Sequence, residues 1–150
     1  MKKSLLFLLA AATTIAAFSQ SSKSFYYEKI SNPGKTINFT FGVYHGSMET
    51  VSKSDGNSYS KMMVAVINDK NADDLYWSDY KVYILLRSGE LIYNYTTEAS
   101  SGDFACKYHV PGGSTHKQYI CFGKTFQASD IQKVWLCLAD NNFINLFLNE

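Results

Sequence analysis

The stretch YKVYILLRSGELIYNYT, residues 80–96, decides the fold class of this 150-residue chain. Alternate positions from Tyr80 to Leu86 are apolar or aromatic, and a period of two is typical of a strand with one buried face. A Ser-Gly step then interrupts the pattern, and a second apolar run follows at once. The stretch predicts a β-hairpin with a two-residue loop, in which Arg87 lies opposite Glu90 and the opposite charges attract.

Similar short apolar runs recur along the rest of the chain, separated by turn signals such as Asp-Gly. The run at 62–67 is apolar on both faces, which is typical of a central strand that is covered on both sides. Residues 127–133 hold at most one helical turn, with Ser129 as N-cap. We therefore predict an all-β fold, a single-domain antiparallel β-sandwich of immunoglobulin-like architecture with about eight strands. The expected strands span residues 24–30, 35–45, 59–69, 76–87, 90–96, 104–110, 117–123, 134–140 and 143–149.

The N-terminus has the layout of a secretory signal peptide. Lys2 and Lys3 precede an apolar run from Leu5 to Phe18, and small residues stand before a cleavage point at Ser19. The run is shorter than the roughly 20 apolar residues that span a bilayer, and no basic cluster follows it. We predict that residues 1–19 are removed and that residues 20–150 form an exported domain, periplasmic or extracellular, without a stable membrane span.

The charge balance limits the classes of partner. The chain has 14 basic and 13 acidic residues, and loss of Lys2 and Lys3 leaves 12 basic residues and a net charge of −1. A near-neutral chain lacks the basic stripe that nucleic-acid binding requires, so we expect no nucleic-acid partner. The 11 Tyr and 10 Phe provide large side chains for a core and for contacts. The composition leaves the oligomeric state open.

Two of the three cysteines lie on either side of a Pro-Gly-Gly turn in ACKYHVPGGSTHKQYIC, residues 105–121. A two-residue turn at 113–114 places Cys106 directly opposite Cys121, in a hydrogen-bonded position with Cα atoms about 5.5 Å apart. That distance is compatible with a disulfide, which export permits. We predict a Cys106–Cys121 disulfide, and the alternative is that all three cysteines are reduced and buried.

The same stretch contains a possible zinc ligand set. Cys106, His109, His116 and Cys121 are residue types that hold structural zinc. In strands, however, residues three or five apart point to opposite faces. The four side chains therefore do not converge without a bulge, and we expect neither a metal site nor a cofactor.

The fragment ASDIQKVWLCL, residues 128–138, resembles part of an immunoglobulin domain. Trp135 and Cys137 follow an Asp, much as Tyr-x-Cys does in that fold. The partner cysteine of that family would lie far upstream, and no cysteine precedes Cys106. The resemblance therefore implies the sandwich architecture without membership of the family.

Signals for catalysis are absent from the sequence. It contains no nucleophile elbow, metalloprotease signature, phosphate-binding loop or dinucleotide fingerprint. Cys137 lies in an apolar strand with no nearby histidine, which favours packing over nucleophilic chemistry. Asp69, Asn71 and Asp73 alternate like calcium ligands, but Asp74 and Tyr80 stand where an EF-hand needs Gly and Glu. We lean towards a protein without enzymatic activity.

An aromatic group beside the loop at 69–74 is the strongest signal for binding. Trp77 is in phase with Lys81 and so is expected to be exposed, whereas Tyr80 is in phase with the core positions. We predict a ligand site formed by Trp77, Tyr76 and Asp73, which would recognise a glycan, a peptide or an envelope protein. The alternatives are a secreted hydrolase or metal-dependent enzyme with a site assembled from distant strands, and a structural subunit that adds the strand at 143–149 to a partner.

Overall fold

The computed structural model describes residues 25–32, 37–76, 81–94, 109–138 and 141–149, and every structural statement below concerns those residues. They form ten strands and one 3-10 turn. These elements are β1 (Phe25–Asn32), β2 (Ile37–Ser52), β3 (Ser58–Asn68), β4 (Leu75–Tyr76), β5 (Lys81–Leu86), β6 (Leu91–Tyr93), β7 (His109–Val110), β8 (Thr115–Phe122), η4 (Ala128–Asp130), β9 (Ile131–Cys137) and β10 (Phe143–Asn149).

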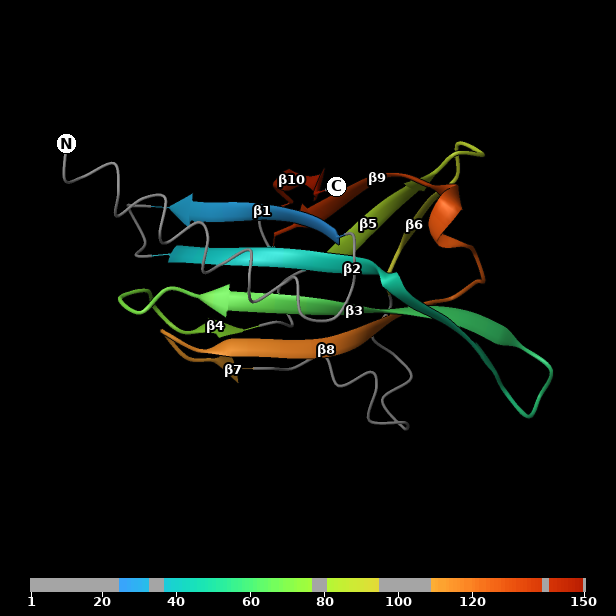
Figure 1. Cartoon of the computed structure of the whole chain (residues 1–150), viewed down its shortest axis with the longest axis horizontal. Coiled ribbons are helices and arrows are strands. Elements are labelled where there is room, and N and C mark those ends of the chain that lie inside the picture. The colour runs from blue at the N-terminus through green and yellow to red at the C-terminus, as the bar shows by residue number, and fades with distance from the viewer. Residues whose placement is uncertain (1–24, 33–36, 77–80, 95–108, 139–140, 150) are drawn as a thin grey trace.

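Eight of the strands form one strongly curled antiparallel sheet in the order β6-β5-β9-β10-β1-β2-β3-β8, and β4 and β7 form a separate two-stranded sheet. Figure 1 shows β1, β2, β3 and β8 as one layer, with β5, β6 and β9 behind it. The strand β10 connects the layers, because Phe143–Leu146 pairs with β9 and Phe147–Asn149 pairs with β1. A bridge between Asn94 and Phe122 joins the two ends of the sheet. The predicted all-β antiparallel sandwich is confirmed.

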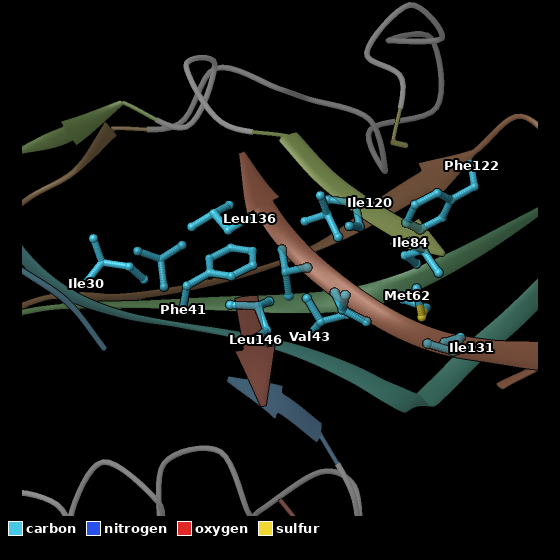
Figure 2. Close-up of a cluster of buried hydrophobic side chains, with 14 of the residues drawn as sticks. Ile30, Phe41, Val43, Met62, Ile84, Ile120, Phe122, Ile131, Leu136 and Leu146 are labelled. Carbon is cyan, nitrogen blue, oxygen red and sulfur yellow. The ribbon is translucent and has the colours of Figure 1, made fainter. Parts of the chain in front are cut away.

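The space between the layers is filled by aliphatic and aromatic side chains from both layers (Figure 2). The alternation predicted for 80–86 is confirmed for its described members, since Val82, Ile84 and Leu86 are all buried in this core. Phe41 and Val43 reach the core from β2, and burying side chains of this size contributes about 1.5–3 kcal/mol each.

The strand β3 is covered on both faces, as its sequence predicts. Met62, Val64 and Val66 lie in the main core, whereas Ala65 packs on the opposite face with Phe25 and Tyr44. Its position between β2 and β8 explains this burial, because a central strand has neighbours along both edges as well as cover on both faces.

The hairpin between β5 and β6 is confirmed, but its predicted loop is one residue too short. Leu86, rather than Arg87, lies opposite Glu90, with the Leu86 amide donating to the Glu90 carbonyl at 2.8 Å. The loop is therefore Arg87, Ser88 and Gly89, and Gly89 has a φ of 87°. A three-residue loop of this type needs a residue at positive φ in its last position, which glycine adopts at low cost. Glu90 forms its ion pair with Lys124 instead.

The Pro-Gly-Gly turn also differs from its predicted form. The Ser114 amide donates to the Pro111 carbonyl, so the central residues are Gly112 and Gly113, and Gly113 has a φ of 78°. A turn at 113–114 would place Val110 opposite Lys117, but Val110 pairs with Leu75. The strand β8 pairs instead with β3, which offers it eight partners from Ser60 to Ile67.

The expected helical turn is corrected. The turn expected within 127–133 with Ser129 as N-cap is a 3-10 turn that begins after Gln127, whose amide donates to the Asp130 carboxylate at 2.8 Å. It ends early because Ile131 is buried and pairs with Leu86 as the first residue of β9. The segment 143–149 forms β10, which lies between β9 and β1 in the sheet order: residues 143–146 pair with β9 and residues 147–149 pair with β1. Its addition to a partner's sheet stays a prediction.

The predicted signal peptide, residues 1–19, lies outside the described residues, and its removal stays a prediction. Within the described part of the chain, no helix has the length and apolar character needed to cross a membrane.

Candidate binding surface

The outer side of the layer formed by β6, β5, β9 and β10 carries a group of aromatic side chains. In the register of the sheet, Tyr83 lies opposite Tyr93 on one neighbouring strand and opposite Trp135 on the other. Residues paired across antiparallel strands share a face, so the three side chains form a row across β6, β5 and β9. We call Tyr83, Tyr93, Trp135 and Phe143 the aromatic face.

Ring contacts hold part of the aromatic face together. The ring centroids of Tyr83 and Tyr93 are 5.3 Å apart, and those of Tyr83 and Phe143 are 5.0 Å apart at an interplanar angle of 62°. Both separations lie in the range where aromatic pairs attract, which contributes about 0.5–1.5 kcal/mol beyond burial of area. Tyr93 and Phe143 thus contact the Tyr83 ring and favour its position on the sheet.

The aromatic face is accessible despite these contacts. Tyr93 is 49 % exposed and Phe143 is 51 % exposed, while Tyr83 and Trp135 are half-buried. Leu91 and Phe147 lie on the same side and extend the exposed apolar area along β6 and β10. Exposed aromatic and aliphatic side chains that gather on one face are typical of an interaction site, whereas scattered ones are ordinary.

The charges on this layer have one sign. The strands β5, β6, β9 and β10 contain no aspartate or glutamate, and their charged residues are Lys81 and Lys133. The Lys81 ammonium lies over the Tyr93 ring, 5.2 Å from its centroid, and Lys133 is exposed opposite Leu85. Both lysines therefore stand beside the aromatic face on its outer side.

The residues predicted for a ligand site lie elsewhere, near β4. Asp73 is exposed, and its backbone carbonyl accepts a hydrogen bond from the side-chain amide of Asn68 at 2.9 Å. Tyr76 is the last residue of β4 and pairs with His109. Trp77 lies outside the described residues, so a site formed by these three side chains stays a prediction.

A carboxylate joins the two loops at this end of the molecule. Asp74 accepts hydrogen bonds from the His109 ring at 2.6 Å and from the Gly112 amide at 3.1 Å. The hydrogen bond from His109 is the main reason that the pKa of Asp74 is lowered, and the Gly112 amide adds to the effect. This arrangement fastens the turn at 111–114 to the start of β4, which is a structural role.

The described residues show how the predicted ligand sets are arranged. His116 pairs with Val66 and Cys121 with Lys61, and alternation along β8 places the two side chains on opposite faces, as the spacing implied. Asp69 hydrogen-bonds with Asn38 and forms an ion pair with Lys29, while Asn71 and Asp73 are exposed. Across the described ranges, no group of three or more His, Cys, Asp or Glu side chains is placed to hold a metal ion.

The cysteine predictions have mixed outcomes. Cys137 is buried as expected, but it points to the same side as the aromatic face, since it lies opposite both Lys81 and Phe143. Cys121 is 1 % exposed and packs beside Tyr59. Cys106 lies outside the described residues, so the Cys106–Cys121 disulfide stays a prediction.

Sequence reasoning did not identify the aromatic face, although one signal was present. Alternation that buries Val82 and Ile84 necessarily turns Tyr83 outward with Lys81. The row itself arises because β9 returns next to β5, and Trp135 is more than 50 positions from Tyr83. Which strands become neighbours is a property of the topology, and a single hairpin pattern does not contain it.

Comparisons with known proteins define the fold and leave the family open. No family model and no curated protein matches the chain. Among solved structures, the chain is similar to MPT63, a secreted protein from Mycobacterium tuberculosis, with 12 % sequence identity and a TM-score of 0.53. The match covers 81 % of this chain and 88 % of that one. At this identity the likeness establishes a shared β-sandwich fold.

Proposed function

We propose that this protein is an exported, non-enzymatic binding domain that recognises a glycan on its aromatic face. The observation that carries the proposal is the row of Tyr93, Tyr83 and Trp135 across three neighbouring strands. The row lies on a sheet surface, with strand β5 paired on both sides. It therefore offers ring faces to a ligand, and not a free strand edge of the kind that captures peptides in extended form.

The chemistry of the rings suits a sugar. The face of an aromatic ring carries partial negative charge, and the C–H groups on the flat side of a pyranose carry partial positive charge, so the two surfaces attract as they exclude water. Tyrosine and tryptophan also keep a polar O–H or N–H at one end, which can bond to sugar hydroxyl groups. Tyr83 and Trp135 are half-buried, so their positions are fixed by the sheet while their rings remain reachable.

Two observations support export. Residues 1–19 have the pattern of a cleavable signal peptide. The structural neighbour MPT63 is described as a secreted protein, so this fold is compatible with export from the cytoplasm. An exported domain meets cell-surface and extracellular polysaccharides, which are ligands of the proposed class.

A protein partner is the second candidate, in line with the peptide or envelope-protein ligand expected from the sequence. It is favoured by Leu91 and Phe147, which are exposed on the same side of the sheet as the aromatic face and have no polar group to offer a sugar. Burial of these side chains against a partner would follow the usual anatomy of an interface, with an apolar centre and a polar rim.

A glycan and peptide array tests these proposals. Tyr83→Ala and Trp135→Ala should abolish glycan binding, whereas Phe147→Ala should leave it intact and would lower only binding to a protein or peptide. Tyr119→Ala is the matched control, because Tyr119 also packs under a lysine, Lys61, but on the other layer.

Trp77→Ala tests the site predicted at Trp77, Tyr76 and Asp73. Binding that Trp77→Ala removes and Trp135→Ala does not would refute the aromatic face as the site.

A further inference from the structure

We infer that the ligand of the aromatic face is an acidic glycan, one that carries carboxylate or sulfate groups along its chain. This inference rests on the proposed function and adds the charge class of the ligand. Its basis is the pair Lys81 and Lys133, the charged residues of the four strands that form this layer.

The two lysines lie on opposite sides of the aromatic row. Lys81 precedes Tyr83 by two positions on β5, while Lys133 precedes Trp135 by two positions on the antiparallel strand β9. Lys133 is opposite Leu85, four positions after Lys81, so the two lysine positions are about 13 Å apart along the strand direction. A ligand that lies across the rings would therefore have a cation near it on either side.

The setting strengthens the attraction of each cation for an anion. Lys81 is placed over the Tyr93 ring, which restricts its ammonium group without neutralising it as a carboxylate would. The strands β5, β6, β9 and β10 provide no acidic side chain that would repel an anionic ligand. At the neighbouring hairpin, Glu90 is already paired with Lys124. A potential of one sign over the face selects an acidic partner and speeds its approach.

An acidic glycan fits these features better than a nucleic acid. Aromatic rings with lysines can also stack bases, but strands of nucleic acid carry a charge at every nucleotide and are bound along a positively charged groove. Two lysines that flank the rings on opposite sides match widely spaced charges. The expected net charge of −1 after removal of residues 1–19 also opposes general attraction to a polyanion.

The test compares two forms of one polymer, a sparsely de-esterified galacturonan whose free carboxylates are widely spaced and its fully methyl-esterified form, together with a panel of paired acidic and neutral glycans. The protein should bind the acidic members more tightly, with an affinity that falls as salt rises from 20 to 500 mM, roughly, since exposed pairs are screened. Lys81→Gln and Lys133→Gln should each weaken that binding roughly two- to five-fold and leave binding to neutral members unchanged. The single variants Lys70→Gln and Lys117→Gln each remove the same one charge elsewhere and should bind as the original protein does.

The outcomes separate the two proposals. Equal binding to acidic and neutral members, lost in Tyr83→Ala and Trp135→Ala, would overturn the acidic specificity and leave the glycan-binding function standing. Binding to acidic members that both aromatic variants retain would overturn both proposals, as would an absence of binding to every glycan. Tighter binding to a single-stranded oligonucleotide than to any glycan would also overturn both. Circular dichroism and thermal unfolding of each variant establish that it is folded.

Discussion

Asn94 and Phe122 form an isolated antiparallel bridge that joins the two ends of the eight-stranded sheet. Asn94 follows the first strand in the sheet order, and Phe122 ends the last. Asn94 is 2 % exposed, and its side-chain oxygen accepts a hydrogen bond from the Val82 amide at 2.6 Å. The sandwich is thus closed by a polar residue whose hydrogen bond lies inside the protein.

Substitution Asn94→Ala tests this closure. The change leaves the buried Val82 amide without its acceptor, and an unsatisfied buried donor costs about 1–3 kcal/mol. Urea unfolding should show a loss of that size in the free energy of unfolding. The exposed Gln132→Ala is the control and should change it by about 0.5 kcal/mol or less. Equal effects of the two substitutions would show that the hydrogen bond contributes nothing to closure.

Substitution Gly112→Ala tests the close approach of two loops. A Cβ atom at residue 112 would lie 2.5 Å from the Ala72 carbonyl oxygen, a contact that backbone must move to relieve. We expect a loss of about 3 kcal/mol, the upper range for overpacking. Gly56→Ala is the comparison, because Gly56 has open space around it but a φ of 83°. A side chain there meets no steric clash and only the cost of the backbone conformation. The substitution should cost about 1 kcal/mol. A smaller effect at 112 than at 56 would contradict the close approach.

His45 should make stability depend on pH. Its ring is half-buried, 5.2 Å from the ring of Tyr26, and burial lowers its pKa because desolvation disfavours the charged form. The unfolded chain then binds the proton more readily than the folded one. As the pH drops below about 6.5, the ordinary pKa of histidine, the free energy of unfolding should fall. The fall should end once the pH is below the lower pKa that His45 has in the folded protein.

Urea unfolding at several pH values between 5 and 8, roughly, should show this fall in the original protein and a smaller one in His45→Gln. An identical pH dependence in both proteins would assign the effect to other groups. Asp74 acts at lower pH with the same sign. Its lowered pKa stabilises the fold above the ordinary carboxyl range, and that contribution is lost as the pH falls through the folded value.

The Cys106–Cys121 disulfide is tested by thiol labelling of the unfolded, unreduced protein. If the bond forms, one cysteine of the three reacts, and reduction raises the number to three. Labelling should be repeated on Cys121→Ser, where the disulfide is removed and both remaining cysteines should react without reduction. Three reactive thiols in the original protein before reduction would exclude the bond.

The fold class could be predicted from the sequence because local pattern and burial agree. The side of a strand that meets a core can be read from its local pattern. One side is apolar in residues 82–86, and both sides are apolar in residues 62–67. Loop details were less predictable. The loop at 87–89 has one residue more than predicted because Arg87 is not paired with Glu90. Its amide donates a hydrogen bond to the carbonyl of Asp130, which is 43 positions away in the sequence.

The candidate surface shows where sequence reasoning stops. The sequence pattern favours Trp77, because that residue is out of phase with the core and close to acidic side chains. Trp135 instead belongs to the fragment that resembles an immunoglobulin domain. Nothing local to either residue shows that Trp135 lies beside Tyr83, because strand order is set by the packing of the whole sheet.

The sequence by itself determined that this chain forms an antiparallel β-sandwich, since side-chain alternation is fixed by the geometry of a single strand. It also determined which residues of β5 point inward and which outward. Only the tertiary structure decided which outward residues are neighbours. The curled sheet brings β6, β5, β9 and β10 side by side, and this order gathers Tyr93, Tyr83 and Trp135 into one row with Lys81 and Lys133 at its flanks. Contacts between residues far apart in the chain depend on the total free energy of packing, and no short stretch of sequence specifies it.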